Sequence, residues 1–212
     1  MIEMKRGSVP AGLAKTNRKF KMAIAGMSKE EAYAFYDNNK GKYKYNTYET
    51  TERFKKMTYE RCSFCTQCIQ NFDTEMTVEH IRTKRDYPKK IFQWSNLLCS
   101  CNTCNGIRGT SPLDSDKYLD PTKVENISQY FEYNNQGEIL PNKKMTKEQQ
   151  EKADYMIKKY KLDRPDLNKK RKKFMEDLME KEHFYELLES EDFSSQYIIF
   201  LSVFTYYRRC VK

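Results

Sequence analysis

The chain has 212 residues, of which 38% are hydrophobic and 14% are aromatic. Disordered chains are poor in aromatic residues, so we expect this chain to fold, as one full domain or two small ones. Its formal net charge of +9 favours polyanionic partners such as nucleic acid. The alternative is an ordinary charged surface in contact with water.

The sequence contains no run of about eighteen apolar residues, so it predicts no membrane-spanning helix. The first fifteen residues, MIEMKRGSVPAGLAK, are basic but are followed by no apolar segment of the kind found in secretion signals. We therefore expect a cytoplasmic protein, in which cysteines stay reduced and a cluster of them binds metal rather than forming disulfides.

The positive charge is unevenly distributed along the chain. The excess is +7 in residues 1–61, zero in residues 62–120 and +2 in residues 121–212. We predict three corresponding regions: a basic, partly helical N-terminal arm, a compact cysteine-rich domain, and a C-terminal region with a hairpin and helices. Tyrosines lie between the lysines of the arm, which suits base stacking and ordinary packing equally well.

In the N-terminal arm, residues 1–20 are expected to be irregular because Gly7, Pro10 and Gly12 interrupt them. Ser28 and Glu31 have the spacing of a capping box, which predicts a short helix to about Tyr36. A second helix is predicted over residues 50–59. In the central region we expect a strand over residues 77–81 and a short helix from Asn105.

The C-terminal region is expected to contain a small hairpin and several helices. Residues 127–133 alternate weakly in polarity and are followed by a turn at residues 134–137, which indicates the hairpin. Helices are predicted over residues 146–162, with Thr146 as the cap, and over residues 166–188. A last helix is predicted over residues 196–209.

Six of the seven cysteines lie between positions 62 and 104. Cys62 and Cys65, and likewise Cys101 and Cys104, form Cys-x-x-Cys pairs that can close a tetrahedron around structural zinc. Cys68 also lies three residues from Cys65, so it could replace Cys62. The alternative of free buried thiols does not explain the paired spacing. Cys99, by contrast, is expected to be a small buried apolar residue.

The chain has two histidines, and only one lies between the cysteine pairs. His183 falls on a predicted helix and is expected to be a surface or packing residue. His80 directly follows Glu79 at the end of the predicted strand, with Asn96 and Asn105 further along. Taken alone, a histidine beside a glutamate is more often structural than catalytic.

The order of these elements changes that interpretation. Cys-x-x-Cys, Glu-His, Trp-x-Asn-Leu-Leu and Cys-x-x-Cys-Asn follow one another, and the string resembles the HNH nuclease motif with zinc knuckles. It is most similar to the PtuB family, the HNH subunit of Septu-type and retron-linked antiphage systems. The resemblance implies a mainly α protein with a small ββα-metal core, a structural four-cysteine zinc site and helical terminal regions.

The resemblance also implies roles for individual residues. His80 would be the general base for water, and Asn96 would orient its ring or fix the loop. Glu79 and Asn105 would hold a catalytic Mg²⁺ or Mn²⁺ ion. Lys84, Arg85 and Arg108 are candidates for phosphate contacts. Glu79 stands where many HNH enzymes have aspartate, which bears on the metal geometry.

The expected function is therefore that of a metal-dependent HNH endonuclease in antiphage defence, working with an ATPase subunit that is similar to PtuA. DNA is the default substrate, and RNA, including transfer RNA, is also possible. Two alternatives stay open. The chain could be a zinc-stabilised binding adaptor without catalysis, or an assembly subunit that docks on an ATPase. Residues 197–207 could be that dock, but a core helix is the favoured interpretation of this stretch. Trp94 is expected to lie in the core rather than to stack on bases.

Overall fold

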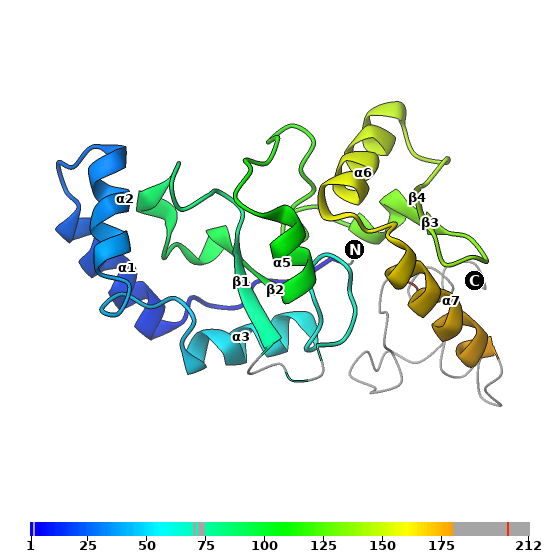
Figure 1. Ribbon diagram of the computed structural model, residues 1–212, viewed down its shortest axis with the longest axis horizontal. Coiled ribbons are helices and arrows are strands. Elements are labelled where there is room, and N and C mark those ends of the chain that lie inside the picture. Colours follow the sequence, from blue (N-terminus) through cyan, green and yellow to red (C-terminus); the bar gives the residue numbers. More distant parts are fainter. Residues whose placement is uncertain (2, 70, 72–74, 180–202, 204–212) are drawn as a thin grey trace.

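The computed structural model describes residues 1, 3–69, 71, 75–179 and 203. The molecule is elongated, with the helices of residues 11–38 at one end, the hairpin and short helix of residues 76–108 in the middle, and the second hairpin and the helices of residues 131–179 at the other end (Figure 1). Within the described residues no helix is long and apolar enough to cross a membrane. His183 and, apart from Val203, the predicted helix 196–209 lie outside these residues.

The first helix, α1 (Ala11–Ala23), shows that the expectation of an irregular segment was wrong for residues 11–20, whereas residues 1 and 3–10 form no helix or strand, as expected. Pro10 is the N-cap and Gly12 lies in the first turn. Backbone N–H groups have no helical partner there, so neither residue interrupts the hydrogen-bond ladder. Leu13 and Phe20 are completely buried on one face of the helix, which stabilises it through packing.

The next two helices begin close to where local patterns predicted them. α2 (Lys29–Asn38) has the expected capping box, in which the Ser28 side chain accepts from the Glu31 N–H and Glu31 accepts from the Ser28 N–H. α3 (Tyr48–Thr58) is capped by Thr47, and it ends where Tyr59 adopts a left-handed conformation with φ of 51°.

The central unit is an antiparallel hairpin followed by a short helix. β1 (Met76–His80) pairs with β2 (Leu97–Cys101), so that His80 lies opposite Leu97. The connection of residues 81–96 contains two single-turn 3-10 helices, η1 (Pro88–Lys90) and η2 (Trp94–Asn96). α5 (Asn102–Arg108) follows β2 directly and begins three residues earlier than expected, because the Cys101 side chain caps it.

The C-terminal part contains the predicted hairpin and two helices. A 3-10 turn, η3 (Ile127–Tyr130), precedes β3 (Phe131–Tyr133), which pairs with β4 (Ile139–Pro141). α6 (Lys147–Tyr160) has Thr146 as its cap, as expected, and α7 (Pro165–Met179) follows after a short turn. The turn glycine, Gly137, has φ of 76°, and a Cβ there would lie 2.2 Å from the Asn168 carbonyl oxygen.

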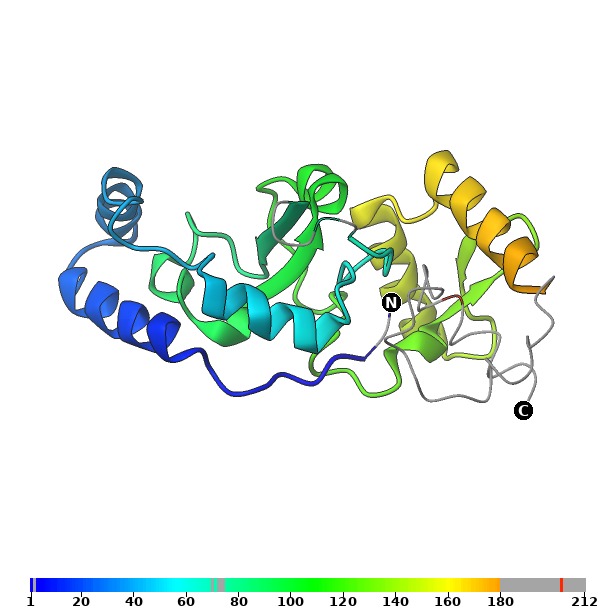
Figure 2. The same cartoon turned by 90° about the horizontal axis from the view of Figure 1, so that it is seen from below.

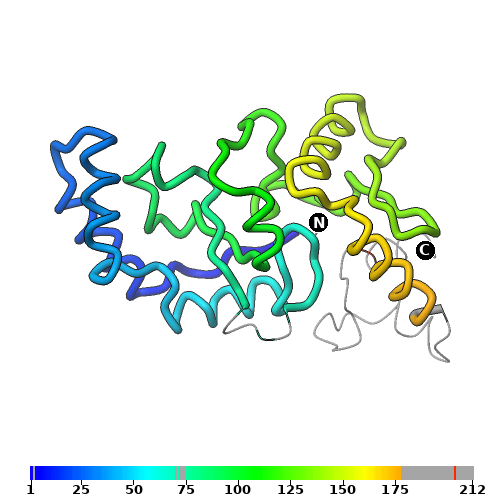
Figure 3. Tube along the Cα trace, viewed as in Figure 1, coloured from blue at the N-terminus to red at the C-terminus, as the bar shows by residue number. Residues whose placement is uncertain are grey.

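The N-terminal segment runs from α1 past the hairpin to the C-terminal part; it follows the lower edge of the molecule in Figure 2 and passes behind the hairpin in Figure 3. The Met4 N–H donates to the Pro121 carbonyl at 2.7 Å, and Arg6 donates to the carbonyls of Trp94 and Leu97 at 2.7 and 2.8 Å. Trp94 is 5% exposed, which confirms that it is a core residue. The division into three regions stays a prediction.

Candidate metal centre and buried histidine site

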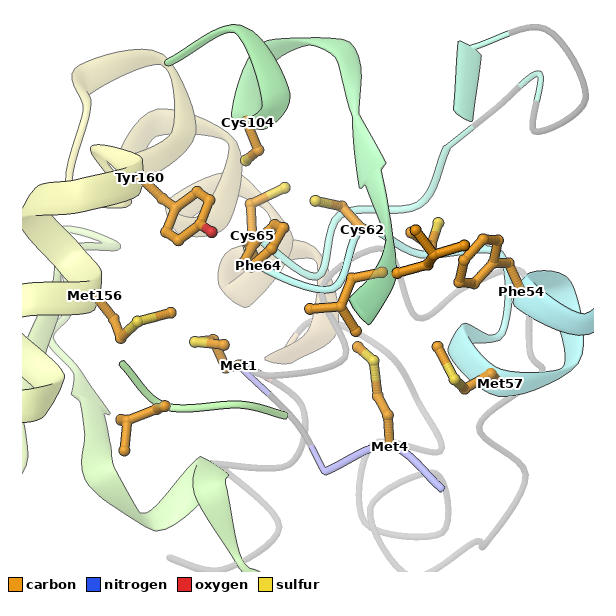
Figure 4. Close-up of a cluster of buried hydrophobic side chains, with 14 of the residues drawn as sticks. Met1, Met4, Phe54, Met57, Cys62, Phe64, Cys65, Cys104, Met156 and Tyr160 are labelled. Carbon is orange, nitrogen blue, oxygen red and sulfur yellow. The ribbon is translucent and has the colours of Figure 1, made fainter. Parts of the chain in front are cut away.

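Four cysteines meet where the segment after α3 crosses the end of β2 and the start of α5. The sulfur atoms of Cys62, Cys65, Cys101 and Cys104 all lie within 4.8 Å of one another. Figure 4 shows the side chains of Cys62, Cys65 and Cys104 close together. Tetrahedral zinc with Zn–S bonds of about 2.3 Å places its sulfurs about 3.8 Å apart, so this donor set fits zinc.

The geometry also decides which cysteine completes the set. Cys68 is not part of this cluster; it lies half-exposed, and its backbone forms an isolated β-bridge with Arg61. Cys62 rather than Cys68 is therefore the fourth candidate ligand. Cys99 is completely buried and its thiol faces the Arg61 carbonyl at 3.6 Å, which confirms the expected role as a small core residue.

The C-terminal part packs directly against this cluster. Phe64, in the turn between Cys62 and Cys65, stacks on Tyr160 at the end of α6. Burial lowers the pKa of the Arg164 guanidinium, but the nearby sulfurs of Cys104 and Cys65 raise it, and the net shift is upward. A zinc ion bound by four thiolates would have a net charge of −2, and a neighbouring guanidinium partly offsets that charge.

His80 is held at the end of β1 with one ring nitrogen already in use. Its Nε2 atom lies 3.0 Å from the Ile91 carbonyl oxygen, and the Tyr45 and His80 rings form a T-shaped contact with centroids 4.8 Å apart. A carbonyl can only accept, so Nε2 carries the proton and the neutral ring has its lone pair on Nδ1. Burial, and then the charge of Lys84, lower the pKa of His80 to about 3.

Glu79 forms a buried ion pair with a residue that the sequence had suggested for phosphate binding. The Glu79 Oε1 and Arg108 Nε atoms are 2.8 Å apart, and both side chains are less than 5% exposed. The pair lacks hydrogen-bond geometry at these two atoms. Burial raises the pKa of Glu79 to about 7, although Arg108 opposes the shift. Arg108 also donates to the carbonyls of His80 and Ile81, so it offers no free surface to a phosphate here.

Asn96 closes the connection between the two strands. Its Oδ1 atom accepts from the Arg82 N–H at 2.7 Å, and its Nδ2 atom donates to the carbonyls of Arg82 and Lys90 at 3.1 and 3.0 Å. Of the two roles considered for Asn96, fixing the loop is the one that these contacts perform.

The remaining predicted residues lie nearer the surface. Asn105 is half-buried on α5. Lys84 is half-buried and donates to the Tyr45 hydroxyl at 3.3 Å, whereas Arg85 is exposed. Glu79 and Asn105 offer the hard oxygen donors that Mg²⁺ prefers, so the donor set fits in kind, but one Glu79 oxygen already faces Arg108.

Sequence reasoning missed several residues that shape the site: Tyr45 and the Ile91 carbonyl beside His80, and Tyr160 and Arg164 beside the cysteines. Each lies far from its contact along the chain. No local pattern could have indicated them.

Comparisons with known proteins point in the same direction as the motifs. No protein-family model matches the chain. Over 90 residues the chain is 32% identical to the Septu protein PtuB of Bacillus thuringiensis, a stretch that covers 42% of this chain and 35% of that protein. The match supports the similarity to PtuB that the motifs indicated. It spans only about a third of the relative, so activity, substrate and partners do not follow from it alone.

Proposed function

We propose that this chain is the nuclease component of a Septu-type antiphage defence system and hydrolyses phosphodiester bonds as an HNH endonuclease. The observation that carries the proposal is the placement of Glu79 and His80 together at the end of β1, in a hairpin that continues into α5 and the cysteine cluster. The similarity to PtuB supports the same assignment.

In this proposal His80 is the general base. Its Nε2–H group is held by the Ile91 carbonyl, which fixes the tautomer and leaves Nδ1 to take a proton from water. Because its pKa is lowered, the ring is neutral near pH 7 and does not need to lose a proton before it acts. Asn96 positions the loop that carries this carbonyl, since it bonds to the neighbouring Lys90.

The acidic partner in the proposal is Glu79. A Mg²⁺ or Mn²⁺ ion held by Glu79 and Asn105 would neutralise developing charge on the scissile phosphate. Arg108 positions the Glu79 carboxylate and, through the carbonyls of His80 and Ile81, the end of β1. Lys84 and Arg85 follow His80 by four and five residues in the chain and remain the proposed phosphate contacts.

The proposal includes a cytoplasmic location, nucleic acid as substrate and an ATPase subunit as partner. DNA is the default substrate. RNA, including transfer RNA, suits the same chemistry, because an external water is the nucleophile and the 2′-hydroxyl takes no part in it.

A second candidate function is a zinc-stabilised adaptor without catalysis. One observation favours it: His80 is 6% exposed and Glu79 is ion-paired, which is how structural polar residues are usually satisfied. An adaptor would bind nucleic acid or protein without cleaving it.

Cleavage of plasmid DNA and of transfer RNA by the full chain, with Mg²⁺ or Mn²⁺ added, separates the two functions. The nuclease proposal expects metal-dependent cleavage that His80→Ala abolishes and that His183→Ala, at the other histidine, leaves intact. Equal cleavage by the wild type and His80→Ala would reject the base assignment. Binding without cleavage of either substrate, with and without the ATPase partner, would favour the adaptor.

A further inference from the structure

The connection that follows His80 is bordered by three adjoining hollows. The first, of about 840 Å³, lies between this connection and α2, and it shares Lys29 and Asp86 with a second hollow of about 420 Å³. The second shares Arg82 with a third hollow of about 380 Å³, which reaches Lys123. Together they border one groove along residues 81–96, which starts at Ile81, the residue that follows the proposed base in the chain. Figure 1 shows this connection between the hairpin and α2.

The groove is positively charged although the central region as a whole has no net charge. Acidic side chains are fewer among its lining residues: Glu30, Asp86 and Asp120. Basic side chains line its whole length: Lys29, Arg82, Lys84, Arg85, Lys90 and Lys123. A row of cations along a groove matches the backbone of a nucleic acid, which presents regularly spaced phosphates.

Three residues in the middle of the groove form a cluster of two cations around one aromatic ring. The Arg82 guanidinium lies 5.4 Å and the Lys90 ammonium 5.3 Å from the centre of the Tyr87 ring. Tyr87 is 40% exposed. In the part of the chain that the structure describes, neither cation forms an ion pair with a carboxylate. Both charges are therefore available to an anion.

Asn96 holds this cluster in place. It accepts from the backbone of Arg82 and donates to the backbone carbonyls of Arg82 and Lys90, so the two cations start from fixed positions 8 residues apart in the chain. An arrangement that is fixed before binding loses less conformational entropy when a ligand arrives.

We infer that this groove is the track for an unpaired nucleic-acid strand, in which Arg82 and Lys90 contact the phosphates and Tyr87 stacks on a base. The inference deepens the proposed function. It rests on that function in one respect, because only a nuclease would need the strand to lead toward His80. An exposed aromatic ring next to cations suits a base whose face is open, and a base inside a duplex offers no open face. The track therefore favours single strands over duplexes.

The test is a binding measurement that needs no cleavage. Fluorescence anisotropy of labelled 20-nucleotide dT and U oligonucleotides and of a 20-base-pair duplex is recorded with the full chain and without added Mg²⁺ or Mn²⁺. The doubly substituted Arg82→Gln/Lys90→Gln protein is expected to bind single strands on the order of tenfold more weakly. The slope of the logarithm of its binding constant against the logarithm of salt concentration should be shallower by roughly 1.4, since each lost phosphate contact contributes about 0.7 on single strands.

The controls separate the track from net charge. Lys143→Gln/Lys144→Gln removes the same charge from exposed positions before α6, and Arg82→Lys keeps the charge in the groove; both should bind nearly as the wild type does. Tyr87→Ala should weaken binding of single strands more than binding of the duplex. The metal content and Tm of each variant show that it is folded.

Equal losses in the groove and control variants, or a wild type that binds none of the probes, would overturn the track. Failure of the track and failure of the nuclease proposal give different results. If the wild type cleaves nucleic acid and the groove variants bind single strands as tightly as the wild type, the track alone is rejected. If the groove variants lose binding of single strands but the wild type cleaves neither DNA nor RNA, the nuclease proposal alone is rejected.

Discussion

Phe64 and Tyr160 stack nearly parallel, with ring centroids 3.9 Å apart and planes 14° apart. Phe64 lies between two of the candidate metal ligands, and Tyr160 is the last residue of α6, so the stack joins the metal centre to the C-terminal part (Figure 4). Arg164, just beyond α6, adds a cation near the sulfurs of the same cluster. Order in the cysteine cluster should therefore influence order in α6.

Removal of the metal tests this coupling. Chelation leaves four buried thiolates or thiols without a common partner, so the turn that carries Phe64 loses its shape and Tyr160 loses its stacking partner. Hydrogen exchange in the last turn of α6 should then become faster, while α2, which is held by its own capping box, should change much less. Unaltered exchange in α6 after complete metal removal would show that the stack does not depend on the metal.

The buried His80 makes stability depend on pH in one direction. Its pKa is lowered from 6.5 to about 3, chiefly by burial. Below about pH 6.5 the unfolded chain takes up a proton that the folded chain does not, so stability falls as the pH decreases. Urea unfolding at several pH values should show that the wild type loses stability relative to His80→Gln by up to about 1.4 kcal/mol per pH unit. If the stabilities of the wild type and of His80→Gln changed with pH in the same way, the burial of a neutral His80 ring would be contradicted.

The neighbouring Glu79 acts in the opposite direction. Its pKa is raised from 4.5 to about 7, chiefly by burial. Between these values the folded chain keeps a proton that the unfolded chain releases, so the contribution of Glu79 to stability falls as the pH rises from about 4.5 to 7. Glu79→Gln should therefore gain stability relative to the wild type across this range. A loss instead would mean that the charge of Arg108 outweighs burial and lowers the pKa.

Asn96→Asp tests how the loop is fixed. The substitution keeps an oxygen that can accept from the Arg82 N–H but removes the two donor contacts to the carbonyls of Arg82 and Lys90. We expect a loss of about 1 to 3 kcal/mol in the free energy of unfolding, because two partly buried carbonyl acceptors are left without this donor. Unfolding curves check the size of this loss. Full stability of Asn96→Asp would show that other contacts fix the loop.

Local patterns in the sequence predicted the elements whose signals lie within a few residues. The capping boxes of Ser28 with Glu31 and of Thr146 with Gln149 are contacts at a spacing of three, and both helices begin where expected. The Cys-x-x-Cys spacing likewise predicted the set of candidate metal ligands, and the sequence left open only whether Cys62 or Cys68 completes the set.

Contacts between distant segments could not be predicted in this way. Arg6 and Trp94 are joined across 88 residues, and Glu79 meets Arg108 only because α5 packs against β1. Pro10 was interpreted as interrupting structure, whereas its position at the cap of α1 makes it compatible with a helix. Burial is a property of packing, and it decides whether a charged residue such as Arg108 faces a ligand or another side chain.

The cysteine cluster is the central claim, because it fixes the position of β2 and α5 beside Glu79 and His80. Native mass spectrometry of the purified chain measures it most directly, together with elemental analysis. The account predicts one zinc ion per chain in the wild type and in Cys68→Ser, and none in Cys104→Ser. A wild type without tightly bound metal, or a Cys104→Ser protein that keeps it while Cys68→Ser loses it, would contradict the account.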